Sequence, residues 1–190
     1  MNEYLSLNTR LLATPDRAGL QAKADGQLDV LVRLQAPEAQ PGAKARPPYG
    51  IALVIDRSGS MTGRPLEQAR RCATFVLDSL HGADKVSLTQ FDNRVEVLSP
   101  ACAAAESGAL RLALSAIHSG GNTNLHGGWR EGAETLTDVG GSGLKRVVLL
   151  SDGQANEGLT DAAAIAAQCA EWATKGPPAP TAWATASTRN

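Results

Sequence analysis

Three oxygen-bearing side chains follow an apolar run in the first third of the chain. Asp56, Ser58 and Ser60 stand at alternate positions directly after the run GIALVI. A second carboxylate, that of Asp152, directly follows another apolar run, VVLLS. Carboxylates and hydroxyls are the oxygen ligands that Mg²⁺, Mn²⁺ and Ca²⁺ prefer, and the set holds no histidine or cysteine for zinc. The pattern therefore predicts a divalent-cation site.

Strand-like and helix-like segments alternate from residue 50 onwards, and they position these side chains. Apolar runs predict strands, and apolar residues spaced by three and four predict helices. This alternation is typical of an α/β fold: a Rossmann-like, doubly wound, mostly parallel sheet with helices on both faces. We expect strands at 50–55, 85–91, 94–98 and 145–151, the third after a hairpin turn at 92–93, and helices at 62–81, 106–117, 125–138 and 160–174.

The two carboxylates fall where such sheets bind ligands, at the carboxyl ends of strands. If the strands at 50–55 and 145–151 are neighbours, the backbones of Asp56 and Asp152 lie about 5 Å apart. Two carboxylates at that distance repel each other unless a proton or a cation lies between them. Two carboxylates, several hydroxyls and water make the hard, six-coordinate oxygen site of a cation such as Mg²⁺.

The same residues resemble a known family. DRSGS at 56–60 matches the DxSxS signature of the von Willebrand factor type A domain family, and the resemblance, to its bacterial type, covers roughly residues 49–176. Thr123 in GGNTNL resembles the threonine of the family's second loop, and Asp152 in LLSDGQAN resembles the aspartate of its third loop. The three pieces occur in the family's order, each at the expected strand or loop.

The resemblance implies a site and a function. The site is the family's metal-ion-dependent adhesion site, which holds Mg²⁺, or Mn²⁺ or Ca²⁺. The function is protein binding without enzymatic activity, in which the cation bridges to an acidic side chain of a partner protein. The residues carried over by the resemblance are Asp56, Ser58, Ser60, Thr123 and Asp152.

Other functions remain open. Ser58 could be a nucleophile, although no histidine neighbours it and GxSxG is absent, and Asp56 could be a phosphoaspartate, although the DxD pattern is missing. A metal-using hydrolase would need a general base that the sequence does not indicate. The chain could also serve as an adaptor subunit of a metal- or ATPase-linked complex, or be a non-functional truncated remnant.

The sequence predicts three parts: a β-rich extension and linker at 1–48, the incomplete family domain at 49–176, and a tail at 177–190. A strand is expected at 27–35, whereas residues 1–25 show no clear period. The tail is rich in Ala, Pro and Thr, so we expect it to be disordered and to form no strand. The apolar strand at 145–151 would then be an exposed sheet edge, which favours aggregation.

The tail also departs from the family, whose pattern continues with a strand reading like TxGLGxxFNE and then a helix, strand and helix. In a shifted frame, APTAWATASTR can encode RTNGLGDGFNE, given suitable degenerate bases. We therefore hypothesise a truncation caused by a frameshift near codons 176 to 178. A nucleotide sequence with no family-like segment in any other frame would contradict this.

Composition limits the class of protein. The chain is 43% hydrophobic and 19% charged with a net charge of -1, which predicts a globular protein and gives no basic surface for nucleic acid. No run reaches the roughly 18 apolar residues of a membrane span. The opening MNEY lacks a signal-peptide pattern, so we expect a cytoplasmic protein.

Overall fold

The computed structural model describes residues 10–15, 30–35, 46–141, 143–152, 155–175 and 182–185. It divides into two compact units, Met1–Ala45 and Arg46–Asn190. In the first unit, β1 (Arg10–Pro15) pairs antiparallel with β2 (Val30–Gln35). β2 lies within the strand expected at 27–35, whereas β1 occupies a segment in which the sequence showed no period.

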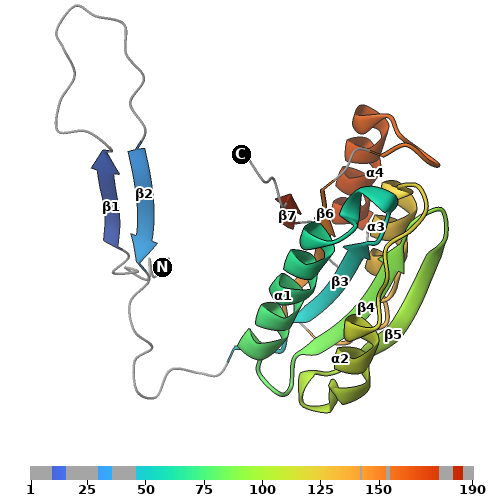
Figure 1. The fold of residues 1–190 in the computed structure, drawn as a ribbon. Coiled ribbons are helices and arrows are strands. Elements are labelled where there is room, and N and C mark those ends of the chain that lie inside the picture. Colours follow the sequence, from blue (N-terminus) through green and yellow to red (C-terminus); the bar gives the residue numbers. More distant parts are fainter. Residues whose placement is uncertain are drawn as a thin grey trace, which may run out of the picture. The chain divides into compact units, whose positions relative to one another are not determined.

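The second unit is built on a five-stranded sheet in the order β5-β4-β3-β6-β7 (Figure 1). β3 is central and pairs in parallel with both β4 and β6, while the hairpin partner β5 runs antiparallel to β4. The two apolar strands that end near the carboxylates are therefore neighbours, as the sequence predicted. The strands are β3 (Gly50–Asp56), β4 (Lys85–Phe91), β5 (Val95–Ala103), β6 (Lys145–Ser151) and β7 (Ala182–Thr185).

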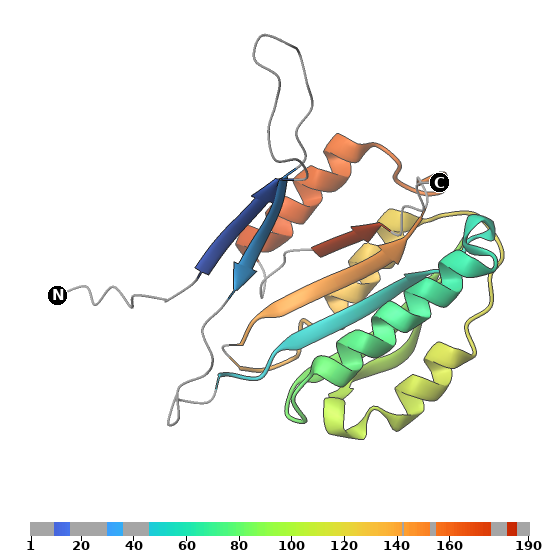
Figure 2. The ribbon, with the colours of Figure 1, turned by 60° about the vertical axis from the view of Figure 1, so that its left-hand side comes forward.

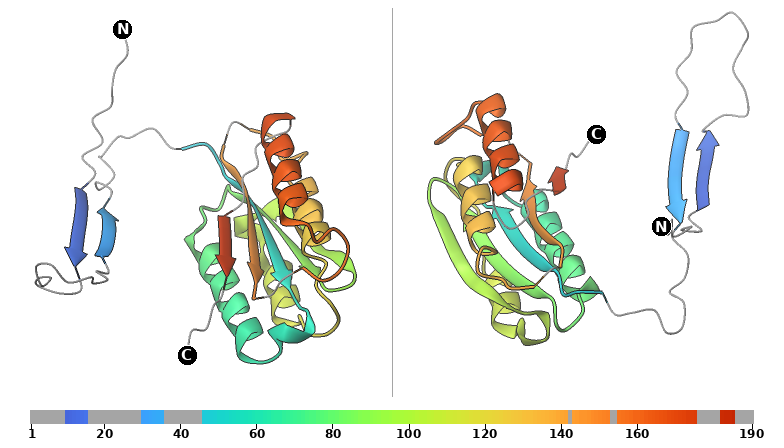
Figure 3. Two further views of the ribbon diagram at one scale, coloured as in Figure 1. Left: turned by 90° about the horizontal axis from the view of Figure 1, so that it is seen from above. Right: turned by 180° about the vertical axis from the view of Figure 1, so that it is seen from behind.

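Helices cover both faces of this sheet. α1 and α2 pack on one face, and α3 and α4 pack on the other (Figure 3). The arrangement confirms the Rossmann-like, doubly wound α/β fold. The helices are α1 (Arg64–Ser79), α2 (Gly108–Ser115), α3 (Leu125–Glu134) and α4 (Ala162–Lys175), with short 3₁₀ turns η1 (Gly59–Met61) and η2 (Ala104–Glu106). None of the described helices is long and apolar enough to cross a membrane.

The central strand β3 contributes to both hydrophobic layers, because it is buried at every position. Leu53 faces the layer under α1 and α2, and Val54 faces the layer under α3. Glycines let α3 approach the sheet closely: a Cβ atom at Gly132 would lie 2.3 Å from Val54 Cγ2. Burial on both faces explains why the sequence of β3 is a continuous apolar run.

The strand β7 corrects two expectations from the sequence. Residues 182–185 form a strand, although the tail was expected to form none, and this strand pairs in parallel with β6 (Figure 2). The edge of β6 that was expected to be exposed is therefore paired from Val148 to Ser151. The other residues of the tail, 177–181 and 186–190, lie outside the described residues.

The beginning of the second unit is fixed by a buried carboxylate. Asp84 is fully buried and accepts two hydrogen bonds from the Arg46 guanidinium, at 2.7 and 2.6 Å. It also accepts bonds from the backbone amides of Tyr49 and His81, both at 2.8 Å. The Arg46 guanidinium lies 3.6 Å from the centre of the Tyr49 ring. These contacts, which we call the Asp84 clasp, hold the residues before β3 against the turn before β4.

Candidate metal centre

Asp56 forms the floor of the candidate site at the carboxyl end of β3. Its side chain is fully buried, and its two oxygens have different donors. Oδ1 accepts from the Ser58 amide at 2.8 Å, and Oδ2 accepts from the Ser151 hydroxyl at 2.5 Å. Burial raises the pKa of Asp56, hydrogen bonds from Ser151 and Ser58 oppose this effect, and the nearby charge of Asp152 adds to it. The carboxylate is thus buried with hydrogen-bond donors, but none of the described ion pairs balances its negative charge.

A chain of hydroxyl groups connects the loop after β3 with the loop after β6. Ser60 Oγ donates to Asp152 Oδ1 at 2.9 Å, across 92 residues of sequence. Ser58 Oγ lies within hydrogen-bond distance of Ser60 Oγ, at 3.1 Å. Ser58 is buried, whereas Ser60 and Asp152 are exposed. The structure therefore brings together four of the five predicted residues and leaves the outer two open to solvent.

Thr123, the fifth residue, reaches this edge through the backbone of its loop. The Gly120 amide donates to the Arg57 carbonyl at 2.7 Å, and the Gly59 amide donates to the Gly121 carbonyl at 2.9 Å. Gly121 has a φ of 79°, and a Cβ atom there would lie 2.4 Å from an oxygen of the Asn93 side chain. Only glycine fits that position, which keeps the second loop against the first. Thr123 is 3% exposed.

Asn156 holds Thr123 from the third loop, and the sequence analysis missed it. The Thr123 amide donates to Asn156 Oδ1 at 2.7 Å, and the Asn156 amide donates back to the Thr123 carbonyl at 3.1 Å. The Glu157 amide also donates to that carbonyl, at 3.3 Å. Asn156 follows Asp152 by four residues, so the loop that supplies one predicted ligand also positions another. An asparagine in a loop often bonds to the backbone through its side chain, and this signal was available in the sequence. Its partner lies 33 residues away, however, and only the fold brings the two together.

Arg57 is a second residue whose role the sequence did not predict. Its guanidinium forms an ion pair with Asp92 at 2.6 Å and donates to the His118 carbonyl at 3.3 Å. Asp92 begins the turn after β4, and its carbonyl accepts from the Asn124 amide at 3.0 Å. Arg57 therefore ties the loop after β3 to its neighbours, and its charge is neutralised by a residue outside the predicted ligand set.

The donor set fits a hard divalent cation. It offers two carboxylates, one of them buried with a raised pKa, and hydroxyl groups already arranged between them. In the part of the chain that the structure describes, no group of three or more His, Cys, Asp or Glu side chains gathers to hold a metal. A cation at this edge would therefore depend on serine and threonine oxygens as well as carboxylates, which suits Mg²⁺ rather than zinc.

Comparisons with known proteins agree with this geometry. The family model of the von Willebrand factor type A domain matches residues 51–154. Inter-alpha-trypsin inhibitor heavy chain H1 of Sus scrofa is 30% identical over 124 residues, and the match covers 60% of this chain and 14% of that protein. The uncharacterised protein sll0103 of Synechocystis is 28% identical over 116 residues, covering 61% of this chain and 28% of that protein. The chain thus spans less than a third of each of these relatives.

Solved structures show the same fold. A von Willebrand factor type A protein from Catenulispora acidiphila superimposes with a TM-score of 0.58 at 19% identity, covering 81% of this chain and 34% of that one. BatB from Bacteroides thetaiotaomicron gives a TM-score of 0.55 at 21% identity, covering 73% and 65%. Because the family model matches more than half of the residues, this chain belongs to the von Willebrand factor type A domain family.

Proposed function

We propose that the chain binds a protein partner through a divalent cation, Mg²⁺ or else Mn²⁺ or Ca²⁺. Asp56, Ser58, Ser60, Thr123 and Asp152 would hold the cation directly or through water. An acidic side chain of the partner would complete its coordination. The observation that carries this proposal is the hydroxyl chain from Ser58 through Ser60 to Asp152, which gathers oxygen donors from two loops at one edge of the sheet.

The charges at this edge explain why a partner's acid suits the site. Two carboxylates balance a divalent cation, and hydroxyl groups add donors without adding charge. Because neutral hydroxyl groups are weak donors, the cation keeps an affinity for a further carboxylate ligand. Because Ser60 and Asp152 are exposed while Asp56 and Ser58 are buried, a partner would approach from the side of the exposed pair.

The proposal is one of binding and not of catalysis. The Ser58 hydroxyl lies 3.1 Å from that of Ser60, and among the described residues no histidine bonds to it, so nothing in this pair favours a nucleophilic serine. A role as an adaptor subunit of a metal- or ATPase-linked complex would use the same site. A cytoplasmic location, and a partner that is a protein and not a nucleic acid, remain predictions from the sequence.

Thermal unfolding of the purified chain tests whether the site binds metal. Mg²⁺ at about 100 times its Kd adds about 2.7 kcal/mol to the free energy of unfolding. For a chain of this size that raises the melting temperature by about 5–10 °C. We expect this rise with Mg²⁺ or Mn²⁺ and its loss in Asp56→Ala. An equal rise in the variant would show that the ion acts elsewhere, and a folded chain that does not respond would contradict the proposal.

Binding of a carboxylate to the loaded site is the second half of the test. The probe is the peptide Gly-Glu-Gly-Gly-Gln-Gly, with blocked ends, added to the ¹⁵N-labelled chain. We expect amide signals of the loops at 57–60 and 119–124 to shift with Mg²⁺ and not with EDTA. The matched control replaces the glutamate of the peptide by glutamine, which should abolish these shifts.

A further inference from the structure

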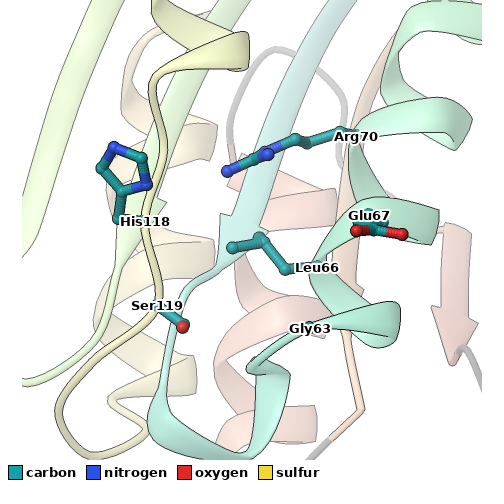
Figure 4. Close-up of a pocket in the computed structure, with 6 residues that line it drawn as sticks. All are labelled: Gly63, Leu66, Glu67, Arg70, His118 and Ser119. Atoms are coloured by element: carbon teal, nitrogen blue, oxygen red, sulfur yellow. The ribbon is translucent and has the colours of Figure 1, made fainter.

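A pocket of about 230 Å³ opens between the first turns of α1 and the segment that follows α2 (Figure 4). It is separate from the five predicted metal ligands. Leu66 and Arg70 extend from α1 toward the segment that carries His118 and Ser119 (Figure 4). The lining residues are Gly63, Leu66, Glu67, Arg70, His118 and Ser119.

The walls of this pocket continue the loops of the candidate metal centre. Gly63 follows Ser60 by three residues, so their Cα atoms are at most about 11 Å apart. On the other wall, Ser119 precedes Gly120, whose amide bonds to the loop after β3. Thr62 Oγ1 joins the two walls, since it donates to the Gly59 carbonyl at 2.7 Å and lies 3.0 Å from Ser119 Oγ. A partner seated on the cation would therefore reach the pocket.

Arg70 gives the pocket its chemical character. Its side chain is half-buried, and one terminal nitrogen donates to the Ile117 carbonyl. Its Nε is buried and has no hydrogen-bond partner in the described part of the chain. Of the described carboxylates, none forms an ion pair with this guanidinium. A partly desolvated cation without a counterion is unfavourable, and a carboxylate that pairs with its guanidinium would relieve this.

We propose that this pocket takes a second carboxylate side chain from the same protein partner. The inference rests on the proposed function, in which a first acidic residue of the partner meets the cation. In an extended peptide, acidic residues three positions apart lie about 10 Å from each other. That span lies within the upper limit of about 11 Å for the Cα atoms of Ser60 and Gly63, so we take two acids separated by two residues as the partner segment.

The test compares two peptides on the ¹⁵N-labelled full chain with Mg²⁺. One is Gly-Glu-Gly-Gly-Glu-Gly, and the other, with one acid, is Gly-Glu-Gly-Gly-Gln-Gly. We expect the first to bind about fivefold more tightly, the gain of a partly exposed ion pair. We also expect it alone to shift the Nε–Hε signal of Arg70. Equal affinities with an unmoved Arg70 signal would overturn the inference while leaving the proposed function standing.

Substitution at two neighbouring arginines isolates the pocket. Arg70→Gln should remove the advantage of the peptide with two acids and leave the binding of the peptide with one acid unchanged. Arg71→Gln is the matched control, because Arg71 is the next residue of α1, is exposed and does not line the pocket. Loss of the advantage in both variants would mean a general charge effect, which contradicts a specific subsite.

EDTA separates the two proposals. If the peptide with two acids still shifts the Arg70 signal without metal, the pocket binds a carboxylate on its own and the metal bridge is the part that fails. Were Arg70→Gln to unfold the chain, the Nε–Hε signal of the unaltered chain would still decide, because it requires no substitution.

Discussion

Asp56 carries a charge that its surroundings disfavour until a cation is present. Burial raises its pKa, so the metal-free folded chain binds a proton more readily than the unfolded chain. The free energy of unfolding that this group contributes therefore falls as pH rises above about 4, the pKa range of an unfolded aspartate. The same charge becomes favourable when a divalent cation neutralises it, which links stability to metal.

Asp56→Asn tests this link without metal. The variant has no group to titrate at this position, so we expect its stability relative to the unaltered chain to increase as pH rises from about 4 to 7. The measurement is urea unfolding in EDTA at several pH values. With Mg²⁺ at neutral pH the order should reverse, because only the unaltered chain binds the ion. A difference that stays constant with pH in EDTA would show that Asp56 is not perturbed.

Asn156 is expected to set metal affinity without contacting the metal. Asn156→Ala removes the acceptor of the Thr123 amide, and loss of such a supporting bond weakens metal binding by about 10-fold or more. Asn156→Asp keeps an oxygen in the same place and should bind Mg²⁺ at least as well as the unaltered chain. Calorimetric titration with Mg²⁺ measures both. Equal losses in the two variants would show that Thr123 is held by other contacts.

Among the elements, the Asp84 clasp is expected to carry stability that the exposed ion pairs do not. The Arg46 guanidinium and the two amides hold the pKa of Asp84 far below its usual range. Its contribution is therefore complete above about pH 4 and is lost as pH falls below that value. Asp84→Ala should cost about 3 kcal/mol at neutral pH, since it leaves a partly buried guanidinium and two amides without their acceptor.

Asp78→Ala is the matched control for the Asp84 clasp. Asp78 also pairs with an arginine, Arg111 at 2.8 Å, but the side chains of Arg111 and Asp78 are 40% and 59% exposed. Its loss should change the free energy of unfolding by about 0–1 kcal/mol. Urea unfolding at neutral pH and at about pH 3 compares the two variants, and the deficit of Asp84→Ala should shrink in acid. Similar costs for both would mean that burial does not strengthen the clasp.

The sequence predicted the elements better than their ends. Helix 62–81 was expected, but α1 begins at Arg64, because Gly63 before it has a φ of 77° and cannot continue a helix. The strands β3 and β6 were predicted closely, since burial on both faces leaves an unbroken apolar run. β7 was missed because its four residues, AWAT, are a short stretch in a tail rich in Ala, Pro and Thr, and its pairing with β6 is made by the backbone.

The candidate site was predictable where its residues follow the apolar runs that predicted β3 and β6. Asp56 and Asp152 end apolar runs, so the sequence alone places both at one edge of the sheet. The alternate spacing after Asp56 also identified Ser58 and Ser60 as candidate ligands, and the family resemblance identified Thr123. Asn156 and the Arg57–Asp92 ion pair were not predictable, because each joins residues that only the completed fold brings together.

At the scale of the whole molecule, metal binding should stabilise the second unit throughout and not only its loops. The predicted ligands come from three separate segments, and Asp56 ends the strand that contributes to both hydrophobic layers. We expect the slowest amides of the buried strands β3 and β6 to exchange only when the unit unfolds. Mg²⁺ at about 100 times its Kd should therefore slow their hydrogen exchange about 100-fold. Slowing confined to the loops, with β3 unchanged, would contradict this.

The strand order also determines when the edges of β3 can pair during synthesis. β3 receives β4 on one side soon after it leaves the ribosome, but its other neighbour, β6, is synthesised about ninety residues later. At about 5–20 residues per second, one edge of this apolar strand stays unpaired for about 5–20 s. During that interval the unpaired edge of β3 can form backbone hydrogen bonds with other chains, which favours aggregation. A chaperone that covers this edge until β6 is synthesised would reduce that aggregation.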